Sequence, residues 1–143
     1  MWIKIIVLCY LLASTSQQQI EKQVIYDIPL TETMQQYTRE VAQKYNVPFS
    51  LVLGVMKVES NFNPNVKSHT NDYGLMQINA CNISWLRETL GANNILDPEY
   101  NIECGTLMLG DLYKRYNGDL NKVLMAYNIG ENGAKSLWKQ GLS

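Results

Sequence analysis

Apolar residues recur three or four positions apart along most of the chain, which is the spacing of amphipathic helices. The first such stretch contains Met34, Tyr37, Val41 and Tyr45. Thr31 is placed to cap its start, and the turn formers at residues 46–48 end it. The polar residues between the apolar positions, such as Gln35, are then expected to face solvent.

The next stretch begins after Pro48 and is apolar on nearly every side. Its apolar residues are Leu51, Val52, Leu53, Val55, Met56, Val58 and Phe62. A helix without a wide polar face is normally buried, so Glu59 near its end is expected at or beside a cleft. Burial raises the pKa of a carboxyl group, as a general acid near neutral pH requires. The plainer alternative is a helix-end residue that points to water or pairs with Lys57 or a distant arginine.

The segment after this helix is predicted to line the cleft. Residues 63–71 are rich in turn formers, and residues 74–79 are expected to form a tight, strand-like or irregular turn. A short helix is predicted around residues 83–87. In a longer one over residues 98–116, Gly105 and Gly110 each cost ~1 kcal/mol relative to alanine. Those two glycines indicate close packing against the helix that carries Glu59.

The last long helix is expected to begin after a cap at Asp119. Its inner face is formed by Leu120, Val123, Leu124 and Tyr127. Gly130 and Gly133 are predicted to end it, ahead of a short helix that holds Leu137 and Trp138. Since no repeat, interior linker or sustained strand alternation interrupts this pattern, the predicted fold class is mostly α.

Composition narrows the function classes. The 143 residues are 46% hydrophobic and 17% charged, which fits one globular domain. The net charge of -1 leaves no basic excess for a phosphate backbone, so nucleic acid is not an expected partner.

The first 16 residues are typical of a secretory signal peptide. Lys4 supplies a positive start, residues 5–13 form an apolar run, and residues 14–16 offer a cleavage site. A bilayer span needs ~20 apolar residues, which is more than this run provides. We expect removal of the segment and export to the extracellular space, cell wall or periplasm, with an uncleaved membrane anchor as the alternative. Residues 17–30 are then a lead-in segment and residues 31–143 the folded domain.

The cysteines and the histidine limit the available chemistry. Cys9 belongs to the leader, which leaves Cys81 and Cys104 as a candidate disulfide in an exported protein; two free core cysteines are the alternative. The single histidine, His69, sits in a polar loop. Metal catalysis and Ser-His or Cys-His nucleophiles therefore lack their parts, and no cofactor or metal is expected.

Three short blocks carry a family resemblance. They are Glu59-Ser60, the Gly-Leu-Met-Gln block at residues 74–77 and the Ala-Tyr-Asn block at residues 126–128. In this order they resemble the lytic transglycosylase domain, of the soluble lytic transglycosylase type, in the lysozyme superfamily. The resemblance covers residues 37–138. It implies a lysozyme-like α-domain with a substrate groove, which acts as a monomer on peptidoglycan glycan strands, alone or with envelope-spanning machinery.

The resemblance also implies a reaction and its residues. Glu59 protonates the oxygen of the β-1,4 bond between N-acetylmuramic acid and N-acetylglucosamine, and the bond is cleaved. Glu59 then takes the proton from the 6-hydroxyl, which attacks the anomeric carbon and closes a 1,6-anhydro ring. The implied substrate-binding residues are Ser60, Met76, Gln77, Asn79, Tyr127 and Asn128. If residues 77–79 are extended, the side chains of Gln77 and Asn79 face the same way. Met76 and Tyr127 can instead be core residues, and Ser60 can bond to a backbone carbonyl.

Asp72 opens a second reading of the same site. The Asp-Tyr-Gly string at residues 72–74 also resembles animal-type lysozyme, in which this aspartate is the second catalytic carboxylate. A pair of carboxylates ~5 Å apart would permit retaining hydrolysis by a muramidase. Asp72 can equally be a turn carboxylate. A third reading is a non-catalytic glycan-binding assembly factor, which keeps the groove but performs no cleavage.

Overall fold

The structure is a computed structural model that describes residues 24–142. Its helices are α2 (Glu32–Lys44), α3 (Phe49–Ser60), α4 (Ile83–Leu90), α5 (Pro98–Arg115) and α6 (Leu120–Lys139). Between α3 and α4 lie two short strands, β1 (Asp72–Tyr73) and β2 (Ile78–Asn79), and a 3-10 turn, η1 (Ala80–Asn82). The predicted mostly α class is confirmed. The predicted signal peptide and residues 17–23 of the lead-in lie outside the described residues.

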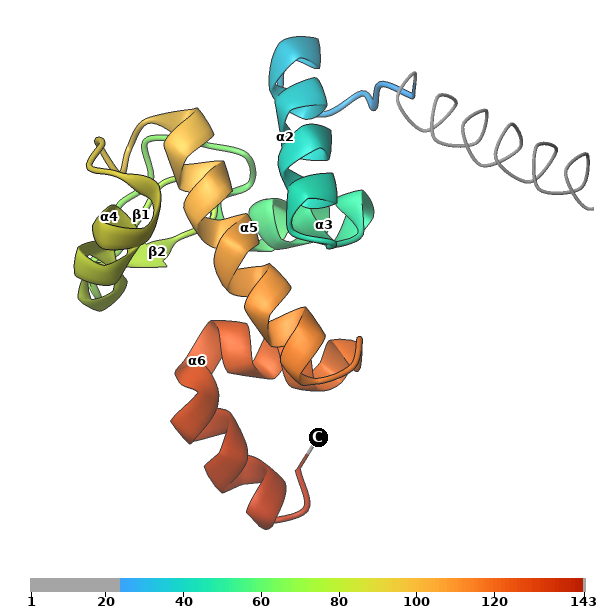
Figure 1. Ribbon diagram of the computed structural model, residues 1–143, viewed down its shortest axis with the longest axis vertical. Helices are drawn as coiled ribbons and strands as arrows, with labels where there is room; N and C mark the ends of the chain where they lie inside the picture. The colour runs from blue at the N-terminus through green and yellow to red at the C-terminus, as the bar shows by residue number, and fades with distance from the viewer. Residues whose placement is uncertain (1–23, 143) are drawn as a thin grey trace, which may run out of the picture.

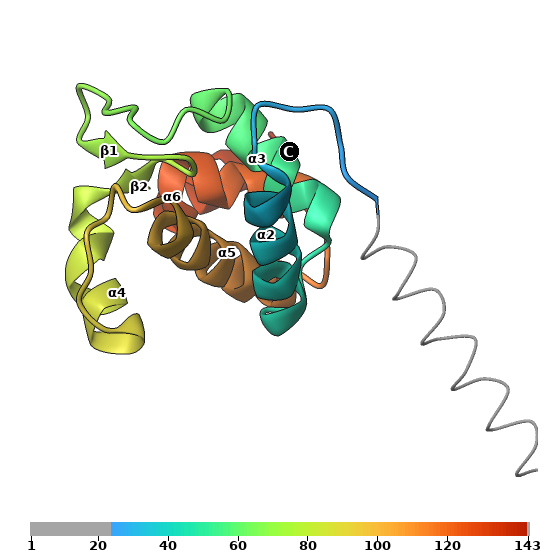
Figure 2. The ribbon, with the colours of Figure 1, turned by 90° about the horizontal axis from the view of Figure 1, so that it is seen from above.

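Helix α5 is the centre of the arrangement. In Figure 1, α2 and α3 lie on one side of it, the β1–β2 hairpin and α4 on the other, and α6 lies at its C-terminal end. Figure 2 shows α2 packed alongside α5, with α3 crossing above both. The inward face of α5 includes Ile102 and Leu109, both fully buried. Because α5 contacts α2, β2 and α6, and α3 packs on α2, helix α5 sets the positions of the segments that carry the sequence blocks directly or through α2.

Helix α2 begins as predicted, but one of its glutamines differs from expectation. Thr31 accepts a hydrogen bond from the backbone nitrogen of Met34. Gln35, predicted to face solvent, is only 1% exposed. Its amide accepts from the nitrogen of Tyr26 and donates to the carbonyls of Tyr26 and Leu30, each at 2.9 Å. The Gln35 side-chain amide can both donate and accept hydrogen bonds. It is buried because it bonds backbone groups of the lead-in segment, which lie outside any helix or strand.

The prediction that α3 is buried all round is wrong. Val52, Val55 and Met56 are in the core, whereas Val58 is 84% exposed. Helix α3 packs against α2, so only one side of it is covered. An all-apolar pattern cannot tell which side that is. The Glu59 side chain lies at the border between the covered and open sides, and it is half-buried.

The glycines of α5 do mark close packing, but against other partners than predicted. A Cβ on Gly105 would lie 2.4 Å from the Met76 sulfur, and one on Gly110 would lie 2.9 Å from the Tyr45 carbonyl oxygen. The two glycines therefore admit the segment between the strands and the connection that follows α2. Neither of these close contacts is with the helix that carries Glu59.

Helix α6 is kinked at Gly130, whose φ is 74° and ψ is 154°. This break was predicted, but Gly133 does not end the helix. The chain continues helically to Lys139 and includes Trp138. None of the helices in the described residues combines the length and apolarity needed to cross a membrane.

The disulfide hypothesis is wrong for this structure. Cys81 is an exposed free cysteine in η1, and Cys104 is a buried free cysteine in α5. The Cys104 thiol is buried in the core, which raises its pKa to about 11. The alternative of two free core cysteines holds for Cys104 alone, because Cys81 is free but exposed.

Candidate active site

A groove of about 780 Å³ runs from the hairpin and α4 across α5 to α6. Its volume is in the range of pockets that bind small molecules, ~300–1,000 Å³. Six residues singled out from the sequence line it: Glu59, Asp72, Gln77, Asn79, Tyr127 and Asn128. The fold thus brings together side chains from α3, the hairpin and α6.

Glu59 enters the groove from the last turn of α3. The half-burial of its side chain raises the pKa of the carboxyl group, and the negative charge of Asp72 raises it further. No hydrogen bond holds this carboxyl group among residues 24–142, and the neighbouring Lys57 bonds to Asn61. The plainer alternative, in which Glu59 pairs with Lys57, does not hold. The arrangement favours a proton on Glu59 when no substrate is bound.

Asp72 lies opposite Asn79 in the β1–β2 pairing. Its Oδ2 accepts hydrogen bonds from the hydroxyls of Ser68, at 2.6 Å, and Thr70. Its Oδ1 accepts from the Asn79 amide at 2.7 Å. Burial alone would raise the pKa of Asp72, but these three donors outweigh it and, with the His69 charge, lower the pKa. Asp72 is therefore held as an anion with both oxygens occupied.

The turn between the strands is built on a buried asparagine. Asn101 of α5 accepts from the Met76 nitrogen and donates to the carbonyls of Tyr73 and Ile95, all at 2.8 Å. Gly74, with a φ of 77°, packs so closely that a Cβ would lie 2.4 Å from the Asn101 amide nitrogen. The glycine is required here both for its left-handed backbone and for this contact.

Gln77 is not in an extended segment. Its φ is 46°, and its amide donates to the carbonyls of Val66 and Gly74. The condition under which Gln77 and Asn79 would face the same way, an extended segment over residues 77–79, is therefore not met, because the chain enters β2 only at Ile78. Gln77 still lines the groove, and its amide oxygen is left for a ligand that can donate a hydrogen bond.

Ser60 and Met76 do not line the groove. The Ser60 hydroxyl donates to the Leu75 carbonyl at 2.8 Å, and Met76 is 0% exposed. The alternative that Ser60 bonds to a backbone carbonyl, and that Met76 is core, describes the structure. Both residues support the turn from behind.

Tyr127 connects α6 to the same turn. Its hydroxyl donates to the Met76 carbonyl at 2.9 Å instead of to Glu59. Burial raises the pKa of Tyr127, and the charges of Glu59 and Cys104 raise it further, so the phenol stays protonated. Asn128, the next residue, is exposed in the groove.

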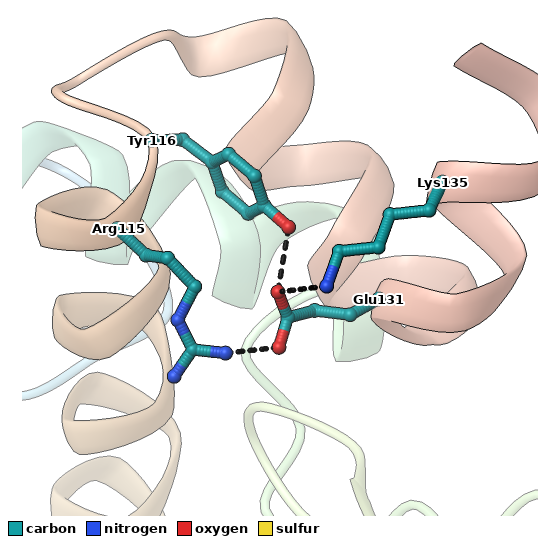
Figure 3. Close-up of polar contacts among 4 residues, drawn as sticks. All are labelled: Arg115, Tyr116, Glu131 and Lys135. Atoms are coloured by element: carbon teal, nitrogen blue, oxygen red, sulfur yellow. Dashed lines mark hydrogen bonds and ion pairs between the residues drawn. The ribbon is translucent and has the colours of Figure 1, made fainter. Parts of the chain in front are cut away.

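The sequence did not identify the charged residues at the α6 end of the groove. There Glu131 accepts from the Tyr116 hydroxyl at 2.6 Å and pairs with Arg115, and Lys135 lies 3.5 Å away (Figure 3). The Tyr116 hydrogen bond, reinforced by the charges of Arg115 and Lys135, lowers the pKa of Glu131. Of the described residues that line the groove, Arg115 is the one cation.

Two of the missed residues differ in how readily the sequence could have found them. Asn101 lies four residues before Gly105 on the inward stripe of α5, and a polar residue at such a position indicates a buried hydrogen-bonding role. Glu131 has no such signal. Its contacts depend on the turn of the chain at Gly130, which periodicity does not predict.

The chain matches a known family and several named relatives in sequence. The family model described as "Transglycosylase SLT domain" matches residues 36–141. A "Transglycosylase" of Enterobacteria phage PRD1 is 38% identical over 91 residues, which cover 64% of this chain and 32% of that protein. "Membrane-bound lytic murein transglycosylase C" of Haemophilus ducreyi is 33% identical over 106 residues, covering 64% of this chain and 29% of the relative.

One solved structure is an inactive mutant of the lytic transglycosylase Slt from Pseudomonas aeruginosa. It superposes with a TM-score of 0.63 at 20% identity, covering 69% of this chain and 17% of that one. This likeness supports the fold. The chain spans about a third of the length of the curated relatives it matches.

Proposed function

The chain belongs to the transglycosylase SLT domain family, and from this premise we propose that it is a peptidoglycan lytic transglycosylase with Glu59 as its only catalytic acid and base. One observation carries the proposal. A half-buried carboxyl group, with no hydrogen-bonding partner within residues 24–142, faces a groove beside a fixed negative charge. Both features favour the protonated form, which a general acid must hold at the start of the reaction.

In the first step Glu59 gives its proton to the glycosidic oxygen between N-acetylmuramic acid and N-acetylglucosamine. The C1–O bond then breaks, and positive charge develops on the muramic acid ring. The Asp72 carboxylate lies in the same groove and is already charged, so it can favour that cation electrostatically without bonding to it.

In the second step the deprotonated Glu59 accepts the proton of the 6-hydroxyl of the same sugar. The oxygen attacks C1, which closes a 1,6-anhydro ring and restores the acid form of Glu59. No water is consumed, and the substrate supplies its own nucleophile. A second enzyme carboxylate with nucleophilic function is therefore not needed.

The hydrogen bonds of Asp72 argue against the hydrolase alternative. Ser68 and Thr70 donate to one oxygen of Asp72, and Asn79 donates to the other. These donors take three of the roughly four lone-pair sites of the carboxylate and lower its basicity, which makes it a weaker nucleophile than a free carboxylate. A carboxylate fixed in this way is better suited to a static electrostatic role.

The groove also suits an N-acetylated glycan. Gln77, Asn79 and Asn128 present side-chain amides in the groove. The amide nitrogens of Gln77 and Asn79 already donate to groups of the protein, so these two residues offer their oxygens. Asn128 can both donate to and accept from the acetamido and hydroxyl groups of such sugars. With this substrate the protein acts in the cell envelope, in keeping with its similarity to a membrane-bound lytic murein transglycosylase. Export by the predicted signal peptide and action as a monomer, with or without envelope machinery, belong to the same proposal.

Glu59→Gln tests the proposal against a non-catalytic role. General acid–base groups typically contribute ~10²–10⁴-fold, so release of soluble fragments from purified peptidoglycan should fall by at least two orders of magnitude. Sedimentation with peptidoglycan should be retained. Glu88→Gln, which removes an exposed carboxylate of α4 outside the groove, is the matched control and should cleave normally. Equal cleavage by wild type and Glu59→Gln would overturn the proposal.

A further inference from the structure

We propose that Trp85 forms a sugar-stacking subsite at the α4 end of the groove, where its indole face binds a pyranose ring of the glycan strand away from Glu59. The inference rests on the proposed function, because it specifies how the same groove holds its substrate. It also assigns a substrate contact to a residue that lies outside the three sequence blocks.

The first observation is the location of Trp85. Its side chain is 36% exposed, and it lines the groove together with Asn79 and Asn82. Large aromatic side chains bury most of their apolar surface in folded proteins. Here a tryptophan leaves over a third of its surface open, and it does so inside the groove. Helix α4 lies well apart from the second half of α6 (Figure 1).

The second observation is that the ring is held in place. The indole nitrogen donates to the Asn82 side-chain oxygen at 3.3 Å, which restrains the ring orientation. The next residue, Leu86, is fully buried and anchors α4 to the core. A ring that is already oriented loses little rotamer entropy when a ligand covers it. These contacts make Trp85 a preformed platform instead of a mobile surface residue.

The third observation is the chemistry around the ring. The C–H groups on one face of a pyranose carry partial positive charge, and the face of an indole ring is negative, so the two surfaces attract while both leave water. The flanking Asn82 amide nitrogen can donate to the acetamido and hydroxyl oxygens at the ring edge, and the Asn79 side-chain oxygen can accept from their N–H and O–H groups. An apolar face bordered by amides fits an N-acetylhexosamine.

The opposite end of the groove has a different character. It is formed by the Arg115 and Glu131 ion pair, which offers charge but no aromatic face. The other described tryptophan, Trp138, does not line the groove. It packs edge-on against Tyr116 with ring centroids 5.2 Å apart. Of the two ends of the groove, the α4 end is therefore the one that offers an indole face, and Trp138 provides a matched control.

Tryptophan fluorescence tests the subsite directly. The probe is triacetylchitotriose, a soluble trimer of β-1,4-linked N-acetylglucosamine, added to the full chain carrying Glu59→Gln to prevent turnover. Stacking should shift the emission to shorter wavelength in a saturable way. The shift should persist with Trp138→Phe and disappear with Trp85→Phe. A shift that survives in Trp85→Phe, or a trimer that binds without any shift, would overturn the proposal.

A kinetic comparison separates this inference from the proposed function. Trp85→Ala should weaken trimer binding and lower kcat/KM on peptidoglycan by about tenfold, and Trp85→Phe should lose less because it keeps an aromatic face. The rate at saturating substrate should change much less than KM, unlike the loss expected for Glu59→Gln. Unchanged binding by folded Trp85→Ala, with cleavage still dependent on Glu59, would reject the subsite and leave the proposed function intact.

Discussion

The Tyr127 hydroxyl donates a hydrogen bond to the backbone carbonyl of Met76 at 2.9 Å, across 51 positions of sequence. This bond joins α6 to the turn between β1 and β2. On the other side of the turn, Asn101 of α5 holds the Met76 nitrogen. The turn that borders the groove is thus fixed from two helices, with Met76 as the shared point.

Tyr127→Phe removes the hydroxyl and leaves the Met76 carbonyl without this donor. An unmade buried hydrogen bond costs ~1–3 kcal/mol, so the free energy of unfolding should fall by about that amount. Cleavage should also weaken, because the turn next to Glu59 loosens. Urea denaturation and fragment release measure the two effects. Tyr113→Phe is the control, since the Tyr113 hydroxyl borders Gly118 outside the groove. Equal stability of the Tyr127→Phe and Tyr113→Phe variants would show that the bond contributes nothing.

Two glycine-to-alanine changes should have opposite effects. A Cβ at Gly105 overlaps Met76, and such overpacking typically costs ~1–3 kcal/mol. Gly54 is exposed on α3, with nothing within 4 Å of an added Cβ, so Gly54→Ala should stabilise by ~0.5–1 kcal/mol through helix propensity. Urea denaturation of both variants tests the pair. A Gly105→Ala variant as stable as the wild type would contradict the packing described for α5.

The raised pKa of Glu59 predicts a pH-dependent stability difference. The folded state holds its proton more tightly than the unfolded state, whose pKa is ~4.3. Stability from this group is complete below the unfolded pKa and is lost as pH rises through the folded pKa. Glu59→Gln should therefore be more stable than wild type at pH 7, and this gain should shrink toward pH 4. A gain that grows toward acid pH has the wrong sign for a raised pKa.

Asp72→Asn should lower activity without abolishing it. Removing the neighbouring negative charge lowers the pKa of Glu59, so the alkaline limb of the pH–rate profile should move to lower pH. The anhydro product should remain the same. The wild-type profile and its Asp72→Asn counterpart, recorded on one peptidoglycan preparation, measure the shift. Loss of turnover as complete as in Glu59→Gln would instead support a nucleophilic Asp72.

The polar contacts of Glu131 should stabilise the fold mainly through its hydrogen bond from Tyr116. A hydrogen bond to a charged group is worth ~1.5–3 kcal/mol, so Tyr116→Phe and Glu131→Gln should each destabilise measurably and should not add. Lys135→Ala should matter little, because its ion pair is exposed. The lowered pKa of Glu131 means that this stability is present above its unfolded pKa and is lost as pH falls through the folded pKa. Additive effects of the two substitutions would contradict the coupling.

The sequence was most informative where chemistry and local pattern coincide. Glu59 at the end of an apolar helix and Asp119 as a cap are local features, and the structure has both. Ser60 and Met76 were identified within recognisable blocks, but their side chains face the interior. A block shows that a segment is needed, but it does not show which of its side chains faces the groove.

The remaining residues depend on tertiary contacts. Trp85 and Arg115 reach the groove only because α4 and α5 border it, and Glu131 does so only because the chain turns at Gly130. Gln35 is buried because a distant segment needs its amide. Val58 is exposed because no neighbouring element covers its side of the helix, and a hydrophobic pattern does not predict which side will be covered.

The central claim is that Glu59 alone provides acid and base for a reaction that consumes no water. Mass spectrometry of the soluble products released from purified peptidoglycan tests it most directly. The account predicts fragments that end in 1,6-anhydro-N-acetylmuramic acid with the wild-type protein, and none with Glu59→Gln. Reducing-end fragments, heavier by the mass of one water molecule, would contradict it and make Asp72 the leading second carboxylate.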